Sequence, residues 1–203
     1  MIKASLQVRF LDLSITNKED REDLKEVLER CMDHGQFVMG QEISNLEKNL
    51  AEYVGRDYCV TVSSGTDAVY LALKGIDIKQ GDEVITTPLS WIATANAIKM
   101  TGAKPVFCDI NQDLNLDPNS IEKVISKNTK ALLTVDYTGN MADYEQIIKI
   151  ANKYKIKLIE DGSQAFGAKY DGRKCGSFGV VSAISHNPMK IFGGLGEIGS
   201  VFT

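Results

Sequence analysis

The sequence predicts an α/β fold in which a mostly parallel sheet is covered by helices on both faces. Short apolar segments alternate with helical segments along most of the chain, an order typical of βαβ units. The composition agrees, since 43% hydrophobic and 25% charged residues are ordinary for a globular protein. A chain of 203 residues is also long enough to bury roughly 70% of the surface of its unfolded state. The sequence shows no internal repeat, low-complexity tract or linker.

Two helices are predicted before the first strand. Thr16-Asn17-Lys18-Glu19 has the form of a capping box, and apolar residues follow it at helical spacing. A second helix places apolar residues from Ile43 to Tyr53 on one face, and Gly55 is positioned to end it. We therefore expect the sheet to begin after about residue 55.

The predicted strands share short apolar runs bounded by turn residues. They are Tyr58–Val62, Glu83–Thr87, Lys104–Cys108, Lys130–Val135, Ile156–Glu160 and Val180–Ile184, with a possible seventh at Glu197–Thr203. Helices are predicted near residues 67–75, 91–101, 118–126 and 142–154. Gly102 would end the second of these helices, and Asp117-Pro118 would begin the third. Asp171-Gly172 predicts a hairpin turn within the irregular region 161–180.

Charge and composition disfavour several classes of protein. The net charge is −4 and the pI is near 5.3, with both signs interspersed, so nucleic-acid binding is not expected. No apolar stretch approaches the roughly 20 residues that span a bilayer, and the N-terminus is too charged for a signal peptide. We expect a soluble, cytoplasmic protein. Four scattered cysteines and two histidines predict reduced thiols and argue against a His-rich metal site.

Ligands of open α/β sheets bind outside the carboxyl ends of the strands, so the residues that follow each strand are candidates for a site. The first strand leads into Ser63-Ser64-Gly65-Thr66-Asp67-Ala68 and then directly into a helix. Backbone N–H groups and the helix dipole at such a start favour a phosphate. An ordinary helix cap is the simpler interpretation of this segment alone.

Three further side chains follow other predicted strands. Trp91 can stack on a flat heteroaromatic ring, although packing in the core would also explain it. Asp161 is a poorly solvated carboxylate that needs a cation, such as a protonated pyridine nitrogen, unless it only caps a turn. Lys190, in a glycine-rich loop, can become an amine nucleophile if burial lowers its pKa, although most lone lysines are surface charges. Together these are the groups that pyridoxal 5′-phosphate (PLP) requires.

The chain resembles the DegT/StrS-type sugar aminotransferases, a branch of the fold-type I PLP enzymes. The matching segments, in the order and spacing of that family, are SSGTDAVYLAL (63–73), GDEVITTPLSWIATANAI (81–98), GAKPVFCDI (102–110), TKALLTVDYTGNMADYEQI (129–147), IEDGSQAFGAKYDGRKCGSFG (159–179) and SHNPMKIFGGLGEIGSVFT (185–203). The resemblance implies a three-layer α/β/α large domain with a seven-stranded, mostly parallel sheet. We expect this domain to fill residues 1–203, with N-terminal helices over about 17–54, and the family's C-terminal small domain to be absent.

The resemblance also implies roles for individual residues. Lys190 aligns with the lysine that forms the internal aldimine, and Asp161 aligns with the acid that pairs with the pyridinium nitrogen. The implied cofactor-binding residues are Gly65, Thr66, Asp67, Trp91, Asp161, Gln164, Ser185 and Lys190. In this set the phosphate is held by backbone N–H groups at Thr66 and Asp67 and by the Ser185 hydroxyl. Trp91 stacks on the ring, and Gln164 contacts the ring's phenolic oxygen.

The implied reaction moves an amino group from glutamate or glutamine to a nucleotide-linked keto-sugar, as in amino-sugar and polysaccharide biosynthesis, in a homodimer. Two alternatives remain open. A sugar dehydratase variant of the family carries histidine in place of the aldimine lysine, so Lys190 favours transamination. A truncated, non-catalytic homologue is the other alternative. His186 departs from the family, where an aromatic residue is commoner at that position.

Overall fold

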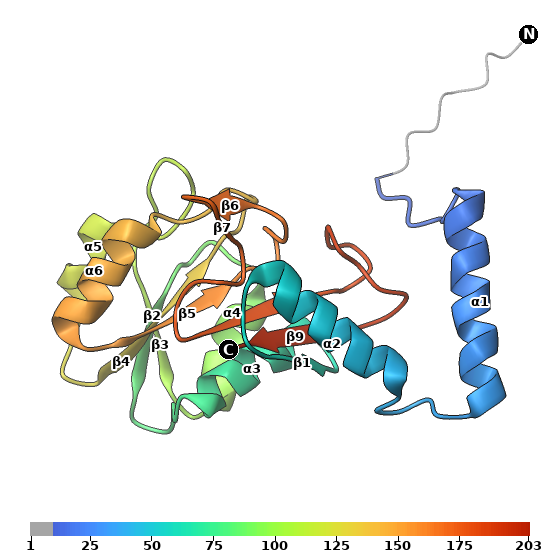
Figure 1. Cartoon of the computed structure of the whole chain (residues 1–203). Coiled ribbons are helices and arrows are strands. Elements are labelled where there is room, and N and C mark those ends of the chain that lie inside the picture. The colour runs from blue at the N-terminus through green and yellow to red at the C-terminus, as the bar shows by residue number, and fades with distance from the viewer. Residues whose placement is uncertain (1–9) are drawn as a thin grey trace, which may run out of the picture. The chain divides into compact units, whose positions relative to one another are not determined.

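The computed structural model describes residues 10–203, which divide into two compact units after Glu42. The elements in chain order are α1 (Lys18–His34), α2 (Gln41–Val54), β1 (Cys59–Val62), α3 (Gly65–Gly75), β2 (Glu83–Thr86), α4 (Ile92–Met100), β3 (Lys104–Phe107), α5 (Pro118–Val124), β4 (Thr129–Val135), α6 (Tyr144–Tyr154), β5 (Lys157–Asp161), β6 (Lys169–Tyr170), β7 (Arg173–Lys174), β8 (Val181–Ser185) and β9 (Gly199–Phe202) (Figure 1). The seven strands predicted for the sheet are confirmed, each end to within two residues.

Seven strands form one sheet in the order β1-β9-β8-β5-β4-β2-β3. The pairs among β8, β5, β4, β2 and β3 are all parallel, whereas β9 runs antiparallel to both β1 and β8. The sheet is therefore mostly parallel, as predicted. The carboxyl ends of β1, β2, β4, β5 and β8 meet at one edge, where a ligand would be expected.

Alternate residues along the central strands pack on opposite faces of the sheet. In β4, Leu132 belongs to one buried cluster, while Ala131 and Leu133 belong to the other. Helices α3 and α4 contribute to the second cluster, and α2, α5 and α6 contribute to the first. The central strands are thus apolar on both faces, and the three-layer α/β/α architecture is confirmed.

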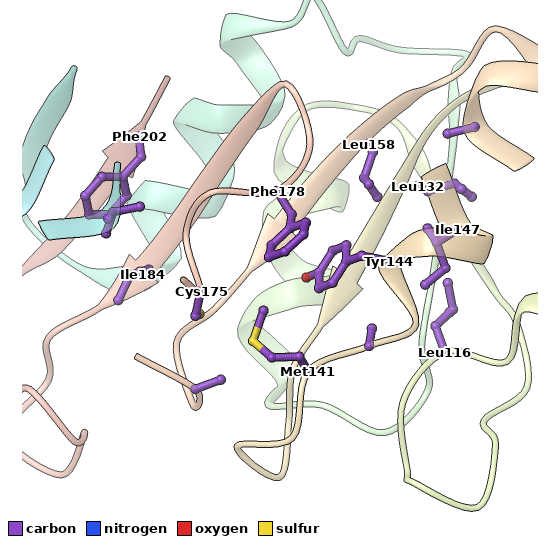
Figure 2. Close-up of a cluster of buried hydrophobic side chains, with 14 of the residues drawn as sticks. Leu116, Leu132, Met141, Tyr144, Ile147, Leu158, Cys175, Phe178, Ile184 and Phe202 are labelled. Carbon is purple, nitrogen blue, oxygen red and sulfur yellow. The ribbon is translucent and has the colours of Figure 1, made fainter. Parts of the chain in front are cut away.

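The face of the sheet beneath α6 is filled by aliphatic and aromatic side chains (Figure 2). Tyr144 is fully buried and stacks on Phe178 with 4.1 Å between the ring centroids. Its hydroxyl reaches Thr134 Oγ1 and Asp136 Oδ2 at 3.1 and 3.0 Å, which satisfies the buried phenol. Asp136 directly follows β4, so its hydrogen bond to Tyr144 attaches the loop after β4 to the core on the face of the sheet opposite α3.

Helix ends follow the sequence signals with one correction. Gly55 and Gly102 adopt positive φ angles of 84° and 85° after α2 and α4, and Asp117 caps α5 with Pro118 in its first turn. The cap of α1, however, is Asn17 and not Thr16. The Asn17 side chain accepts the Glu19 N–H at 2.9 Å, and asparagine is the stronger N-cap residue of the two.

Helix α2 packs with the sheet, although its sequence position groups it with the N-terminal helices. The division between the two units falls after Glu42, and Leu50, Ala51 and Val54 of α2 are buried in the core of the sheet unit. The hairpin expected at Asp171-Gly172 is present, as β6 and β7 pair there with positive φ at both turn residues.

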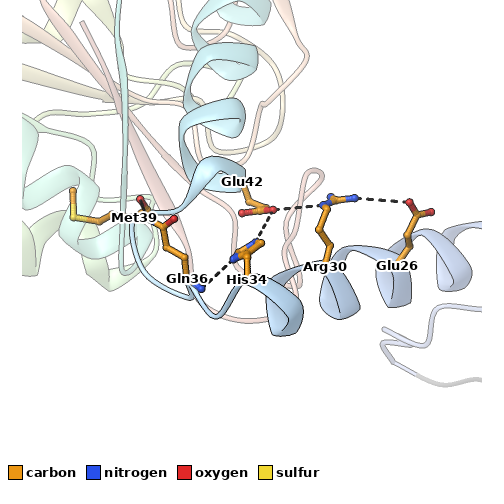
Figure 3. A network of polar contacts seen from close by, with 6 residues as sticks. All are labelled: Glu26, Arg30, His34, Gln36, Met39 and Glu42. Carbon is orange, nitrogen blue, oxygen red and sulfur yellow. Dashed lines mark hydrogen bonds and ion pairs between the residues drawn. The ribbon is translucent and has the colours of Figure 1, made fainter.

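The unit that ends at Glu42 is organised by polar contacts around that carboxylate (Figure 3). Glu42 Oε1 lies 3.6 Å from Arg30 Nε and 3.4 Å from His34 Nε2. His34 Nδ1 in turn accepts the Gln36 N–H at 3.0 Å. These contacts join the end of α1 to the first turn of α2. Helix α1 has no buried residue, and none of the described helices is long and apolar enough to cross a membrane.

Candidate active site

A cavity of about 590 Å³ opens at the carboxyl edge of the sheet. It is lined by Ser64, Gly65, Thr66, Val69, Ser90, Trp91, Ala93, Thr94, Val135, Tyr137, Asp161, Ser163, Gln164, Ser185, Asn187, Met189, Lys190 and Glu197. Seven of the eight residues implied by the resemblance are in this set. The missing one is Asp67.

The start of α3 forms one wall of the cavity. Ser64 caps the helix, and its Oγ accepts the Asp67 N–H at 3.1 Å. The Asp67 carboxylate also accepts hydrogen bonds from the Ser63 and Ser64 hydroxyls. The Asp67 amide therefore serves the helix cap, and the first-turn N–H groups of Gly65 and Thr66 are the ones at the cavity.

Gly65 is required by the close approach of the neighbouring strand. A Cβ atom at Gly65 would lie 2.4 Å from Ser185 Cβ and 2.7 Å from Ser185 Oγ. Ser185 ends β8, so the absence of a side chain at residue 65 brings its hydroxyl next to the start of α3. The N–H groups and this hydroxyl converge on one corner of the cavity.

Asp161 ends β5 and is almost fully buried at the floor of the cavity. Its Oδ1 accepts the Ser163 N–H at 3.2 Å, and its Oδ2 accepts the Thr94 hydroxyl at 3.1 Å. Burial nevertheless raises the pKa of Asp161, which means that these hydrogen bonds do not fully replace water. The charge of Lys190 opposes this increase. The carboxylate would be stabilised by a cation placed in the cavity.

Lys190 reaches the same cavity from the loop between β8 and β9. Its Nζ donates a hydrogen bond to Gln164 Oε1 at 2.9 Å. Burial lowers the pKa of Lys190, while the charges of Asp161 and Glu197 act in the opposite direction. The lowered pKa increases the fraction of neutral amine, which is the nucleophilic form. The structure thus brings residues 190 and 161 into one cleft.

Trp91 stands at the rim of the cavity as the N-cap residue of α4. It is 69% exposed, so the alternative that it is a core residue is wrong. A large, flat apolar side chain that lines a cavity without being packed is available to a planar ligand.

Sequence reasoning missed several polar residues of the cavity, among them Thr94, Tyr137 and Glu197. Tyr137 follows β4, and the same search of strand ends would have found it. Glu197 precedes β9 and accepts a hydrogen bond from the side-chain amide of Asn187. Because β9 is antiparallel, its amino end meets the carboxyl ends of the parallel strands, so a residue that precedes β9 lies at the same edge as the residues that follow them.

A second group of titratable side chains lies outside the cavity lining, among the buried residues around Tyr144. Side-chain ligand atoms of Asp136, Glu160 and Cys175 lie within 4.8 Å of one another. Desolvation raises the pKa of Asp136 to about 8 and that of Glu160 to about 7. Burial also raises the pKa of the Cys175 thiol, which keeps the sulfur protonated and a poor metal ligand.

The other cluster of possible metal ligands is Cys31, His34 and Glu42 in the N-terminal unit. There the Glu42 carboxylate already faces the Arg30 guanidinium, and both ring nitrogens of His34 face polar partners. The contacts of these described residues explain the cluster without an ion.

The layered sheet and the cavity at its carboxyl edge define the class: the fold is that of the fold-type I PLP-dependent transferases. The chain belongs to the DegT/DnrJ/EryC1/StrS aminotransferase family, whose sequence profile matches residues 18–203.

Three similar proteins illustrate the range of the family. The chain is 38% identical to the UDP-2-acetamido-2-deoxy-3-oxo-D-glucuronate aminotransferase of Pseudomonas aeruginosa, covering 97% of this chain and 55% of the relative. The crystal structure of S. venezuelae DesV with a ketimine intermediate superposes with a TM-score of 0.93 at 38% identity, covering 97% of this chain and 53% of DesV. The crystal structure of a GDP-4-keto-6-deoxymannose-3-dehydratase with a trapped PLP-glutamate geminal diamine superposes with a TM-score of 0.84 at 30% identity. The match covers 94% of this chain and 50% of the dehydratase. The chain therefore spans about half the length of these relatives.

Proposed function

We propose that this chain is the cofactor-binding part of a PLP-dependent aminotransferase that moves an amino group from glutamate or glutamine to a nucleotide-linked keto-sugar. The observation that carries the proposal is that the Lys190 amine and the buried Asp161 carboxylate line a single cavity. The similarity to a UDP-sugar aminotransferase and to a structure that holds PLP bonded to glutamate supports both substrates.

The residues of the cavity fit PLP. The N–H groups of Gly65 and Thr66 and the hydroxyl of Ser185 converge at the positive end of α3, where a phosphate would be stabilised. Trp91 would stack on the ring. Asp161, whose pKa is raised by burial, would gain the cationic partner that it needs from a protonated ring nitrogen.

When bound, PLP would supply an electron sink for the bond changes at the carbon that bears the amino group. The chain's own part follows from its geometry. The Lys190 amine, held by Gln164 and with its pKa lowered by burial, can attack an aldehyde and afterwards hold or release a proton at Nζ. The Asp161 carboxylate would hold a proton at the ring nitrogen of the cofactor.

A sugar dehydratase remains the second candidate, because a dehydratase is among the similar structures. That variant of the family carries histidine where this chain has Lys190. A lysine at this position favours transfer of the amino group, since a primary amine can both bind the cofactor and move the proton.

The test is chemical. After incubation with PLP and reduction with borohydride, mass spectrometry should find the cofactor on the Lys190 peptide. Lys190→Ala should abolish this labelling, and the control Lys127→Ala, which removes an exposed loop lysine, should retain it. Labelling that persists in Lys190→Ala would exclude the assignment. Amine transfer from glutamate to a panel of nucleotide keto-sugars then separates the aminotransferase from the dehydratase.

Gly65→Ala should weaken PLP binding by roughly 100-fold or more, because a methyl group 2.4 Å from Ser185 Cβ forces apart the two walls that hold the phosphate. Titration of the visible absorption of bound PLP measures the effect. Gly75→Ala is the matched control, because nothing lies within 4 Å of a Cβ atom at the end of the same helix. Equal loss in both variants would indicate a general defect of α3.

We also propose that the chain associates as a homodimer. Apolar side chains are exposed at the rim of the cavity, where Trp91 is 69% exposed, and in the loop between β8 and β9, where Ile191 is 72% and Leu195 is 76% exposed. Exposed apolar groups of this kind favour association. The monomer mass is 22.3 kDa, and sedimentation of the 203-residue chain should give twice this value. Leu195→Glu should shift the sedimenting species toward the monomer. A wild-type chain that sediments as a monomer at micromolar concentration would contradict the proposal.

A further inference from the structure

We propose that His186 is a positioning residue for Lys190: its imidazole fixes the loop that carries the lysine against strand β9. The loop in question consists of residues 187–197 and is called the lysine loop below. The inference rests on the proposed function, in which the Lys190 amine attaches to the cofactor. It concerns a side chain that does not itself line the cavity.

His186 connects both ends and the middle of the lysine loop. Its backbone N–H donates to Ile198 O at 2.8 Å, and its backbone oxygen accepts the Gly194 N–H at 2.8 Å. Its ring Nδ1 lies 3.1 Å from Phe192 O, and its Nε2 lies 2.7 Å from Ser200 Oγ. One residue thus joins β8, the lysine loop and β9 by four hydrogen bonds.

The chemistry of the partners determines the protonation of the ring. A carbonyl oxygen can only accept, so Nδ1 must carry a proton to bond Phe192 O. Burial lowers the pKa of His186, which favours the neutral ring. In the neutral Nδ1–H form, Nε2 is an acceptor and the Ser200 hydroxyl must donate to it. Phe192 O and the Ser200 hydroxyl then each have a hydrogen-bond partner. His186 is 2% exposed and Ser200 is 0% exposed, so water would not replace these bonds.

The lysine loop needs such an anchor because its side chains bury little surface. Met189, Ile191 and Leu195 are 60%, 72% and 76% exposed. The backbone N–H groups of Met189 and Lys190 bond to Asn187, which lies within the loop itself. Contacts of this kind shape the loop without attaching it to the sheet.

Ring packing alone would not require a histidine. The imidazole contacts Phe166 and Phe192 edge to face, at centroid distances of 5.8 and 5.4 Å. A phenylalanine could make similar contacts, but it would leave Phe192 O and the buried Ser200 hydroxyl without their partners. The polar atoms of the ring, and not its volume, are therefore the part that holds the loop.

The first experiment needs no substitution. The chain has two histidines, so long-range ¹H–¹⁵N correlation spectra contain two imidazole patterns, and His34→Phe assigns them. His186 should be the neutral Nδ1–H tautomer at pH 7. An Nε2–H tautomer would overturn the proposal, because its Nδ1 could not donate to Phe192 O.

The second experiment compares His186→Phe with His186→Asn. Phenylalanine keeps the ring, whereas the asparagine amide can replace Nδ1 as a donor. In His186→Phe the Gly194 amide should exchange at least about tenfold faster, and borohydride trapping of PLP on Lys190 should slow by a similar factor. The Leu133 amide of β4 reports global stability and should change less. His186→Asn should recover part of both effects, and His34→Phe should show neither.

The outcomes separate the two proposals. If His186→Phe traps PLP at the wild-type rate, or if asparagine is worse than phenylalanine in both readouts, His186 acts through packing and the inference fails. Should His186→Phe not fold, Ser200→Ala provides the same comparison at the Nε2 side, with faster Gly194 exchange as the expected result. If wild-type Lys190 never becomes labelled, the proposed function fails, while the tautomer and exchange results still report the state of the loop.

Discussion

Asp161→Asn should remove most of the affinity for PLP while leaving the cofactor-free chain folded and at least as stable. Burial raises the pKa of Asp161, so the ionised carboxylate is held at a cost in free energy that the charge of Lys190 offsets only in part. An isosteric neutral amide removes that cost. It also removes the charge-assisted bond to a protonated ring nitrogen, which is worth roughly 1.5–3 kcal/mol, or roughly 10- to 100-fold in affinity. In amine transfer, loss of one preorganised charge should reduce the rate by about 10²–10³.

The measurements are the PLP dissociation constant and the thermal midpoint with and without PLP. Wild type should gain stability from the cofactor, and Asp161→Asn should gain much less. Asp171→Asn is a matched control, since it changes an exposed hairpin residue whose positive φ of 48° asparagine tolerates. Thr94→Val, which removes one hydrogen bond to Asp161, should have an intermediate effect. If Asp161→Asn destabilises the cofactor-free chain as much as it weakens PLP binding, the residue is structural.

Asp136→Asn should make the stability of the cofactor-free chain less dependent on pH. Desolvation and the nearby Glu160 raise the pKa of Asp136 to about 8 in the folded state, whereas the unfolded value is 3.8. The folded chain therefore binds more protons than the unfolded chain between these values. The stabilisation is complete below about pH 4 and is lost as the pH rises toward 8. Each pKa unit is worth about 1.4 kcal/mol, so the loss should amount to a few kcal/mol.

Urea unfolding at pH 5 and at pH 8 provides the test. The wild type should lose a few kcal/mol more between these pH values than Asp136→Asn. Asparagine can still accept the Ala142 N–H, which bonds Asp136 Oδ1 at 2.8 Å, so the variant should fold. Burial raises the pKa of Glu160 to about 7, so the stability of the variant should still depend on pH to some extent. Identical pH profiles of the two proteins would show that Asp136 is ionised throughout the range.

Much of the site could be predicted from the residues that follow the strands. Because the carboxyl ends of parallel strands share one edge, Gly65, Trp91, Asp161 and Lys190 converge although they are far apart in the sequence. Alternation of helices and strands is a local property, and it was enough to place the strands. The role of Asp67 could not be assigned in the same way, since its amide bonds to Ser64 in the structure.

Other features depend on contacts between distant segments. The pKa values of Asp136 and Glu160 are raised because β4 and β5 pair side by side beneath the loop that contains Cys175 and Phe178. Nothing in the local sequence of Asp136 indicates that environment. Likewise, α2 follows α1 closely in the chain, yet its apolar face is buried with the sheet.

The sequence by itself determined which segments form strands and helices and which side chains stand at the ends of the strands, because hydrophobic period, caps and turn residues act over a few positions. Only the tertiary structure decided the state of those side chains. Burial raises the pKa of Asp161 and lowers those of Lys190 and His186, and burial is a property of everything packed around a group. The antiparallel return of β9 likewise placed Ser200 beside His186 and Glu197 in the cavity, through pairing across the sheet that no local pattern specifies.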